Sequence, residues 1–252
     1  MRIDGTPPVI PRRRLVLLLG GSAGYLDAIS YLALGIFTAN MTGNTVLLGI
    51  AIGQERWLGM VRALLAIAAF VGGAAGGALL LRGRRRLGSV FGVEGACLLL
   101  GLAVWVPLRH PQPGSIIPVP TALPLIALLS AAMGAQSAAV RRVGEQRIST
   151  TYVTGTLTSL AVDTVTEILA RRARRSRPAA DAPPPSKGTL SLLTGIWAAY
   201  VAGALVGGFS QQRWGFWSVV LPVVVLAGMA AWDLSRSAPS APPTASTVGR
   251  RS

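Results

Sequence analysis

Apolar residues are gathered in eight stretches along the chain, separated by short segments rich in arginine, proline and serine. A membrane-spanning helix needs about 20 consecutive, mostly apolar residues. Six stretches approach or exceed that length, namely residues 15–37, 58–81, 88–108, 120–140, 190–209 and 215–234. The hydrophobic pattern therefore predicts an all-α integral membrane protein with about six transmembrane helices, formed by one polytopic domain over residues 15–234.

The two other stretches are less suited to crossing a bilayer. Residues 41–53 are short and begin with Met-Thr-Gly-Asn, and residues 151–170 carry Asp163 and Glu167. Non-spanning backbone at membrane depth is tolerated only where protein or a water-filled cavity surrounds it. We therefore expect these two segments to form short re-entrant or broken helices inside the bundle.

The basic residues distinguish two topologies. If all eight stretches span and the N-terminus is cytoplasmic, 16 basic residues lie inside and 8 outside. If the two short segments return to the side they came from, the division becomes 20 to 4. Lys and Arg concentrate in cytoplasmic loops, so the second topology is favoured. It places both termini in the cytoplasm and the chain in the cell (inner) membrane. The first apolar stretch is too long for a signal peptide, which predicts a retained helix.

Composition supports the membrane assignment and excludes a nucleic-acid partner. The 252 residues are 51% hydrophobic and 13% charged, against about 25% charged in soluble domains. The net charge of +15 comes from arginine runs between apolar stretches, without the interleaved stacking aromatics of a nucleic-acid surface. Segments rich in Pro, Ala, Ser and Arg predict disorder. They are residues 1–11 of a basic cytoplasmic tail at 1–14, a linker at 171–188 and a C-terminal tail at 235–252.

Three short motifs occur twice. Residues 24–28 (GYLDA) align with 134–138 (GAQSA), 38–45 (TANMTGNT) with 150–157 (TTYVTGTL), and 70–77 (FVGGAAGG) with 200–207 (YVAGALVG). The chain is thus predicted to contain two repeats, 15–108 and 120–234. With an odd number of spans in each, the repeats are inverted, and in such proteins the functional site lies between the halves near the bilayer midplane.

These motifs resemble the YoaK-type family of bacterial multi-pass membrane proteins, through the GYLD string, the FTANMTGNT string and residues 151–157. The resemblance extends from about residue 20 to residue 234. It implies a small inner-membrane protein of about six helices, and it implies little about function because the family is largely uncharacterised.

Polar residues at membrane depth are the candidate site. A carboxylate such as Asp27, near the middle of the first helix, is expensive there unless it is solvated, paired or protonated. It is either a proton, cation or ligand site or a structural partner of segment 41–53. Thr and Asn cap helices and Gly permits close approach, so the two Thr-Gly strings predict helix N-termini that favour anionic or neutral polar solutes. Alternatively they only satisfy neighbouring backbone. The candidate substrate-binding residues are Asp27, Asn40, Thr42, Gly43, Asn44, Gln136, Thr154, Gly155 and Thr156.

Two functions are compatible with these features. The first is a transporter or channel for a small polar solute, in contact with lipid. The alternative is a non-transporting scaffold or assembly factor. The pairs Gly73/Gly77 and Gly203/Gly207 suit close helix packing, against each other or in a homo-oligomer. The lone His110 adjoins a proline and Cys97 has no histidine nearby, so we expect no enzyme activity, cofactor or metal.

Overall fold

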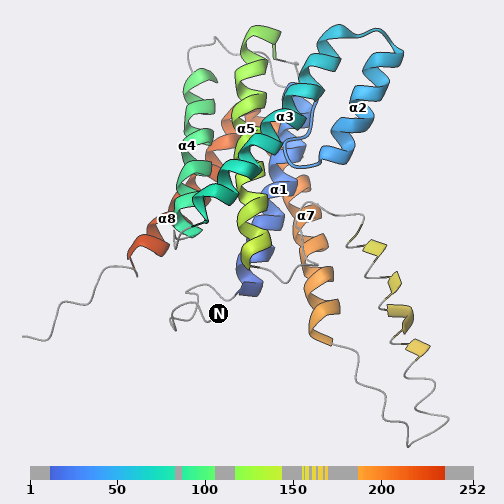
Figure 1. The fold of residues 1–252 in the computed structure, drawn as a ribbon, viewed down its shortest axis with the longest axis vertical. Coiled ribbons are helices and arrows are strands. Elements are labelled where there is room, and N and C mark those ends of the chain that lie inside the picture. The colour runs from blue at the N-terminus through green and yellow to red at the C-terminus, as the bar shows by residue number, and fades with distance from the viewer. Residues whose placement is uncertain are drawn as a thin grey trace, which may run out of the picture.

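A computed structural model describes residues 12–82, 87–105, 117–143 and 187–235, together with single positions between 155 and 169. Every regular element in these ranges is a helix, which confirms the all-α prediction (Figure 1). The elements are α1 (Arg12–Leu34), α2 (Met41–Gly53), α3 (Trp57–Leu80), α4 (Leu87–Trp105), α5 (Val119–Val143), α7 (Lys187–Trp214), the 3-10 helix η1 (Gly215–Val219) and α8 (Val220–Ser235).

Four of these helices are long and apolar enough to cross a membrane. They are α1, α3, α5 and α7, over Arg13–Leu34, Trp57–Leu80, Val119–Arg141 and Ser191–Trp214. Two shorter apolar helices accompany them, α2 at Met41–Gly53 and the part of α4 at Gly92–Val104. A helix of α2's length measures about 20 Å, less than the roughly 30 Å hydrocarbon core, so the prediction of a short second helix is confirmed.

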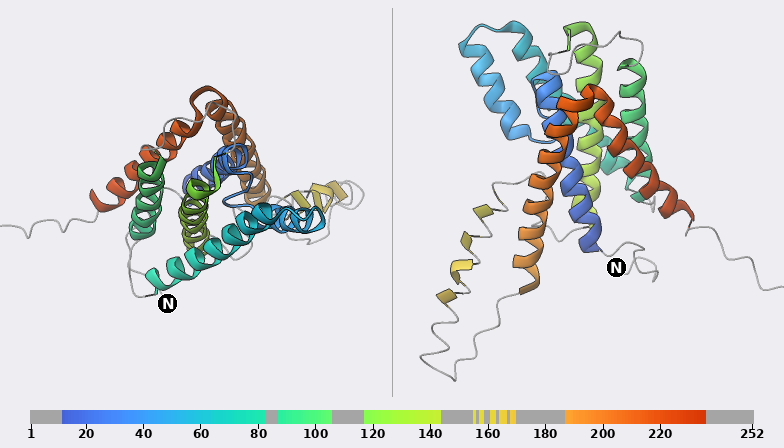
Figure 2. Two further views of the ribbon diagram at one scale, coloured as in Figure 1. Left: turned by 90° about the horizontal axis from the view of Figure 1, so that it is seen from above. Right: turned by 180° about the vertical axis from the view of Figure 1, so that it is seen from behind.

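The first helix of each predicted half lies at the centre of the bundle. Figure 2 shows α1 and α5 surrounded by α3, α4, α7 and α8. Accordingly 61% of the spans of α1 and α5 is buried inside the protein, against 17% for α3 and α7. Helix α7 packs on α1, α3 packs on α5, α4 lies against α5 and α8, and α2 packs on α3.

Glycines bring the packed helix pairs into backbone contact. A Cβ atom on Gly203 would overlap the Gly21 carbonyl of α1, and one on Gly73 would overlap the Ala131 carbonyl of α5. The prediction that the two Gly-xxx-Gly faces serve close helix packing is therefore confirmed, but the alternative in which they meet each other is wrong. Instead, each face packs closely on the central helix of the opposite half, Gly73 on α5 and Gly203 on α1.

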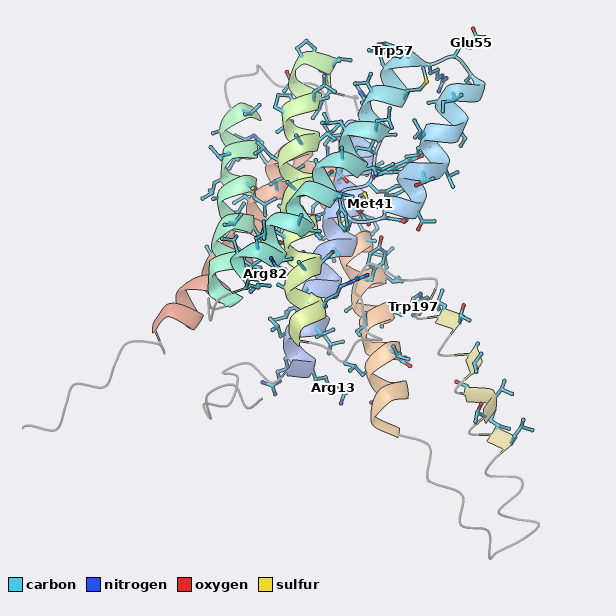
Figure 3. The ribbon with its side chains drawn as sticks, in the orientation of Figure 1. Arg13, Met41, Glu55, Trp57, Arg82 and Trp197 are labelled. Atoms are coloured by element: carbon cyan, nitrogen blue, oxygen red, sulfur yellow. The ribbon has the colours of Figure 1, made fainter. Side chains whose placement is uncertain are left out.

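The chain reverses direction between α1 and α2. Helix α1 ends three residues before the predicted boundary because Gly35 adopts a left-handed conformation (φ 71°), which stops a helix. The connector 35–40 then descends beside α1, so that Ala39 bonds to Asp27, about 10 Å below the end of the helix. From Met41, α2 runs back to the turn at Glu55 (Figure 3). The second helix thus begins partway down the bundle and returns.

Several sequence predictions lie outside the described residues. They are the tails before residue 12 and after residue 235, the Arg84–Arg86 run, residues 171–186 of the linker and most of segment 151–170. The last two linker residues, from Lys187, already belong to α7.

Candidate functional site

Asp27 is the centre of a buried hydrogen-bond network. Its side chain is 2% exposed. Oδ1 accepts a hydrogen bond of 2.7 Å from the Ala39 amide and longer ones of 3.4 Å from the Thr38 hydroxyl and the Asn40 amide. Oδ2 accepts one of 2.7 Å from the Tyr200 hydroxyl on α7. Both carboxylate oxygens are therefore engaged by the chain itself.

Asn44 completes this network from α2. It is fully buried, and its side-chain Oδ1 accepts from the Phe37 amide at 2.9 Å while Nδ2 donates to the Phe37 carbonyl at 2.7 Å. Backbone that is not helical cannot remain unpaired inside a membrane. Asp27 and Asn44 supply the partners that the connector 35–40 lacks, which explains why these two polar residues occur in an apolar chain.

The remaining residues of the motif at 38–45 lie at the start of α2. Asn40 is the N-cap, and its Oδ1 accepts from the Gly43 amide at 3.0 Å. A Cβ atom at Gly43 would lie 2.8 Å from the Phe37 ring, so only glycine leaves room for it. Phe37 in turn stacks on Tyr31, with ring centroids 4.9 Å apart. Thr42 is exposed in the first turn of α2.

Gln136 lies in a different part of the bundle from Asp27. It is buried on α5, and its Nε2 donates to the Leu19 carbonyl at 3.1 Å and to the Ser22 hydroxyl at 3.0 Å. Leu19 precedes Asp27 by about 12 Å along α1. The Asp27 network thus joins α1 to α7, whereas Gln136 joins α1 to α5. Gly155 is at an exposed position, and Thr154 and Thr156 lie outside the described residues.

Helix α5 carries polar atoms that have no hydrogen-bond partner among the described residues. They are the Oε1 of Gln136 and the hydroxyls of Ser130 and Ser137, all buried. The two serines are seven residues apart, so they lie two turns apart on one face of the helix, about 10 Å from each other. On α4, both carboxylate oxygens of the fully buried Glu94 likewise lack a described partner.

Sequence reasoning missed Tyr200, Ser130 and Ser137. The repeat alignment contained a signal for two of them, since Ser137 occupies the position of Asp27 and Tyr200 that of Phe70. At both aligned positions the polar group differs between the two halves, and this difference could have drawn attention to Ser137 and Tyr200. No group of three or more His, Cys, Asp or Glu side chains that could hold a metal ion occurs within the described ranges.

Long apolar helices around a buried polar network define a multi-pass helical transmembrane protein, in contact with the lipid bilayer. The chain belongs to the family described as "Protein of unknown function (DUF1275)", whose model matches residues 15–232. It is similar to the UPF0700 transmembrane protein YoaK of Bacillus subtilis (strain 168), with 30% identity over 219 residues, which cover 86% of this chain and 92% of that relative. The resemblance found in the motifs is thus confirmed. No solved structure matches the chain.

Proposed function

We propose that the protein is a carrier or channel for a small polar solute, with its site between two inverted halves. The observation that carries this proposal is a set of polar atoms on α5, at Ser130, Gln136 and Ser137, that have no partner in the described part of the chain. A buried polar group without a partner costs about 1–3 kcal/mol. A solute or water held beside α5 would offset that cost, and lipid would not.

The helix contacts support the two-half arrangement. The sequence alignment pairs Gly24 with Gly134 and Phe70 with Tyr200. In the structure a Cβ on Gly24 would overlap the Tyr200 carbonyl, and one on Gly134 would overlap the Phe70 carbonyl. An exchange of the two halves turns one contact into the other. The opposite directions of α1 and α5 in Figure 1 agree with inversion of repeats 15–108 and 120–234.

The ends of the bundle support the proposed orientation. Arg13 and Arg82 lie toward one end, and Glu55 and Trp57 lie at the other (Figure 3). The topology with 20 basic residues inside requires the N-terminus and the end of α3 to share a side. We therefore propose cytoplasmic termini in the cell membrane, with α4 and α8 as the fifth and sixth spans and α2 as a re-entrant helix.

The polar groups divide into two roles. Asp27, Asn40, Gly43 and Asn44 hold the connector in place, since their hydrogen bonds go to the chain. Gln136 and the two serines of α5 contact the solute. Hydroxyls and an amide carry no net charge, so we propose that the solute is a neutral molecule with hydrogen-bonding groups.

Flux measurements in liposomes test this function. The purified protein is reconstituted, and entry of glycerol and urea is followed by light scattering, with protein-free liposomes as the blank. Ser137→Val places a methyl group at the position of the hydroxyl, which has no described partner, and should lower solute entry several-fold. Ser218→Ala is the matched control, because its hydroxyl is buried but bonded to Gln211 at 3.0 Å, outside α5.

Absence of entry above the blank for both probes would contradict the proposal and favour the scaffold alternative. A scaffold that forms homo-oligomers would need other glycines than those predicted, because Gly73 and Gly203 are occupied within the chain. Gly72, Gly76 and Gly208 have no atoms near the position of an added Cβ, and they are the open positions for such a contact.

A further inference from the structure

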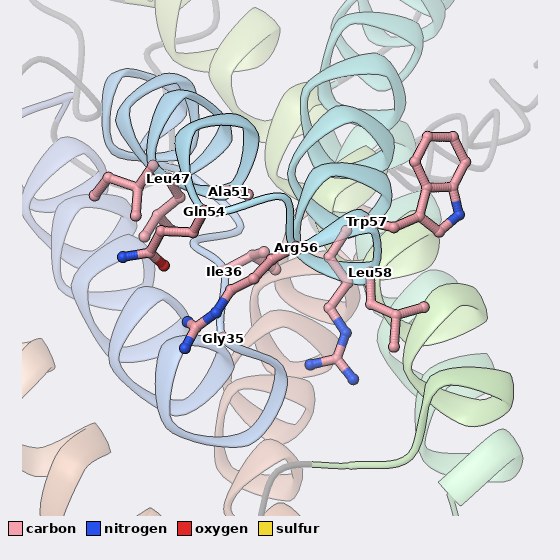
Figure 4. A pocket seen from close by; sticks show the side chains of 11 residues that line it. Gly35, Ile36, Leu47, Ala51, Gln54, Arg56, Trp57 and Leu58 are labelled. Carbon is pink, nitrogen blue, oxygen red and sulfur yellow. The ribbon is translucent and has the colours of Figure 1, made fainter.

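A pocket of about 550 Å³ lies between the end of α1, the helix α2 and the start of α3 (Figure 4). It is lined by Ile36, just after α1, and by Leu47 and Ile50 of α2. Trp57 and Leu58 come from the first turn of α3. None of these residues belongs to the Asp27 network or to the set Ser130, Gln136 and Ser137 on α5, so the pocket is distinct from the proposed transport site.

Two arginines line this pocket and no acidic residue does. Arg62 donates to the Leu34 carbonyl at 3.1 Å and the Ile117 carbonyl at 3.0 Å, which uses two of its five N–H groups. Its buried Nε has no hydrogen-bond partner in the described part of the chain. The Arg56 side chain reaches toward Gly35 in Figure 4. Two positive charges thus share one apolar pocket without a negative charge in its lining.

The depth of the pocket matches the level of lipid headgroups. It lies where two candidate spans end, Arg13–Leu34 at its last residue and Trp57–Leu80 at its first. Tryptophan is enriched at this level of membrane proteins. Three of the large apolar lining residues are exposed by about half or more, Ile50 at 47%, Trp57 at 69% and Leu58 at 54%. Such side chains on a transmembrane protein face the bilayer, so the pocket opens toward lipid.

We propose that this pocket binds an anionic phospholipid. The phosphate lies between the guanidinium groups of Arg56 and Arg62, whose planar donors suit phosphate oxygens. The acyl chains cover the exposed apolar side chains of α2 and α3, such as Val46 and Leu64. The bound lipid would brace the α2–α3 pair against the end of α1, which α2 reaches mainly through the connector.

Lipid binding to the full-length protein in detergent tests the proposal by native mass spectrometry. Dioleoyl phosphatidylglycerol is the anionic probe and dioleoyl phosphatidylcholine, with the same chains, is the zwitterionic control. We expect severalfold tighter binding of the anionic lipid. Arg56→Gln should weaken it about five-fold, as expected for one basic residue near a lipid headgroup. Arg82→Gln removes an equal charge at the other end of α3 and should leave binding unchanged.

Three results would overturn the proposal. Equal binding of the two lipids would show that the headgroup charge is not recognised. Equal loss in Arg56→Gln and Arg82→Gln would indicate general surface charge. Competition by sn-glycerol 3-phosphate at the affinity of the lipid would assign the pocket to a soluble anion. An unchanged thermal unfolding temperature of Arg56→Gln shows that the variant is folded, and solute flux is not part of the test, so failure here leaves the transport proposal standing.

Discussion

The α1–α7 contact and the α3–α5 contact use the same backbone packing but hold different polar groups. In both, a glycine of the central helix lies against the carbonyl of an aromatic residue, Gly24 against Tyr200 and Gly134 against Phe70. At α1–α7 the aromatic residue carries a hydroxyl, which donates to Asp27. At α3–α5 the corresponding residues are Phe70 and Ser137, and the serine hydroxyl has no described partner.

This difference shows that the small residues that bring the helices together are distinct from the polar groups beside them. Close approach of helices depends on small residues, and both contacts retain them. The polar groups at the two contacts do not need to be the same, because their surroundings differ. At α1–α7 they pair the connector that leads into α2, and at α3–α5 the Ser137 hydroxyl has no hydrogen-bond partner among the described residues. The first contact thus anchors the connector, and under the transport proposal the hydroxyl of Ser137 on α5 contacts the solute.

The largest expected effect tests the shared backbone packing. In Gly24→Ala and Gly134→Ala the new methyl group meets a backbone carbonyl that cannot move without its helix. We expect each variant to lose about 2–3 kcal/mol of unfolding free energy, in similar measure. Unfolding of the purified protein in a single detergent measures the loss.

Gly76→Ala is the matched control, because an added Cβ there meets no atom within 4 Å. It should be neutral or slightly stabilising, since alanine favours a helix over glycine. A large loss in only one of the two variants at the contacts would show that the helix pairs do not share their packing.

A smaller effect tests the polar difference. Asp27→Ala leaves the Ala39 amide and the Tyr200 hydroxyl without their acceptor and should cost about 2 kcal/mol. Ser137→Ala removes a hydroxyl that has no described partner and should change stability little. Thermal unfolding compares them. Solute flux per folded molecule should be unchanged in Asp27→Ala, and a complete loss of flux with normal stability would place the solute at Asp27 instead.

Hydropathy predicted the helices well where their ends are polar and less well where they are not. Residues 41–53 were delimited correctly because Asn40 and the Gln54-Glu55-Arg56 turn interrupt the apolar pattern. The end of α1 was misplaced because Ile36 and Phe37 are as apolar as the helix before them. The reversal there depends on the conformation of Gly35, which hydropathy does not register. The break predicted at residues 210–214 was misplaced for the same reason, because α7 continues to Trp214 and the chain turns at Gly215 (φ 58°) and η1.

The sequence predicted the part of the candidate site whose polar groups lie close together along the chain. Asp27 and the string at 38–44 could be expected to meet, because buried polar groups in a membrane need partners. Tyr200, 173 residues away, could not be singled out, because a tyrosine in an apolar helix is compatible with many positions. Only the packing of α7 on α1 brings its hydroxyl to the carboxylate. The separation of Gln136 from Asp27 is likewise set by tertiary packing.

The smallest expected effect concerns the hydroxyl that distinguishes the two contacts. Tyr200→Phe makes α1–α7 resemble α3–α5 at this position and removes the 2.7 Å bond to Asp27. The carboxylate keeps its amide donors, so we expect a loss of about 1 kcal/mol. In the Asp27→Ala background the same substitution should cost almost nothing, because the hydroxyl no longer has its acceptor. Unfolding of the two single variants and the double variant measures this coupling. Equal losses in both backgrounds would mean that Tyr200 stabilises the bundle through its ring alone, and the polar difference between the contacts would then lie only in the connector.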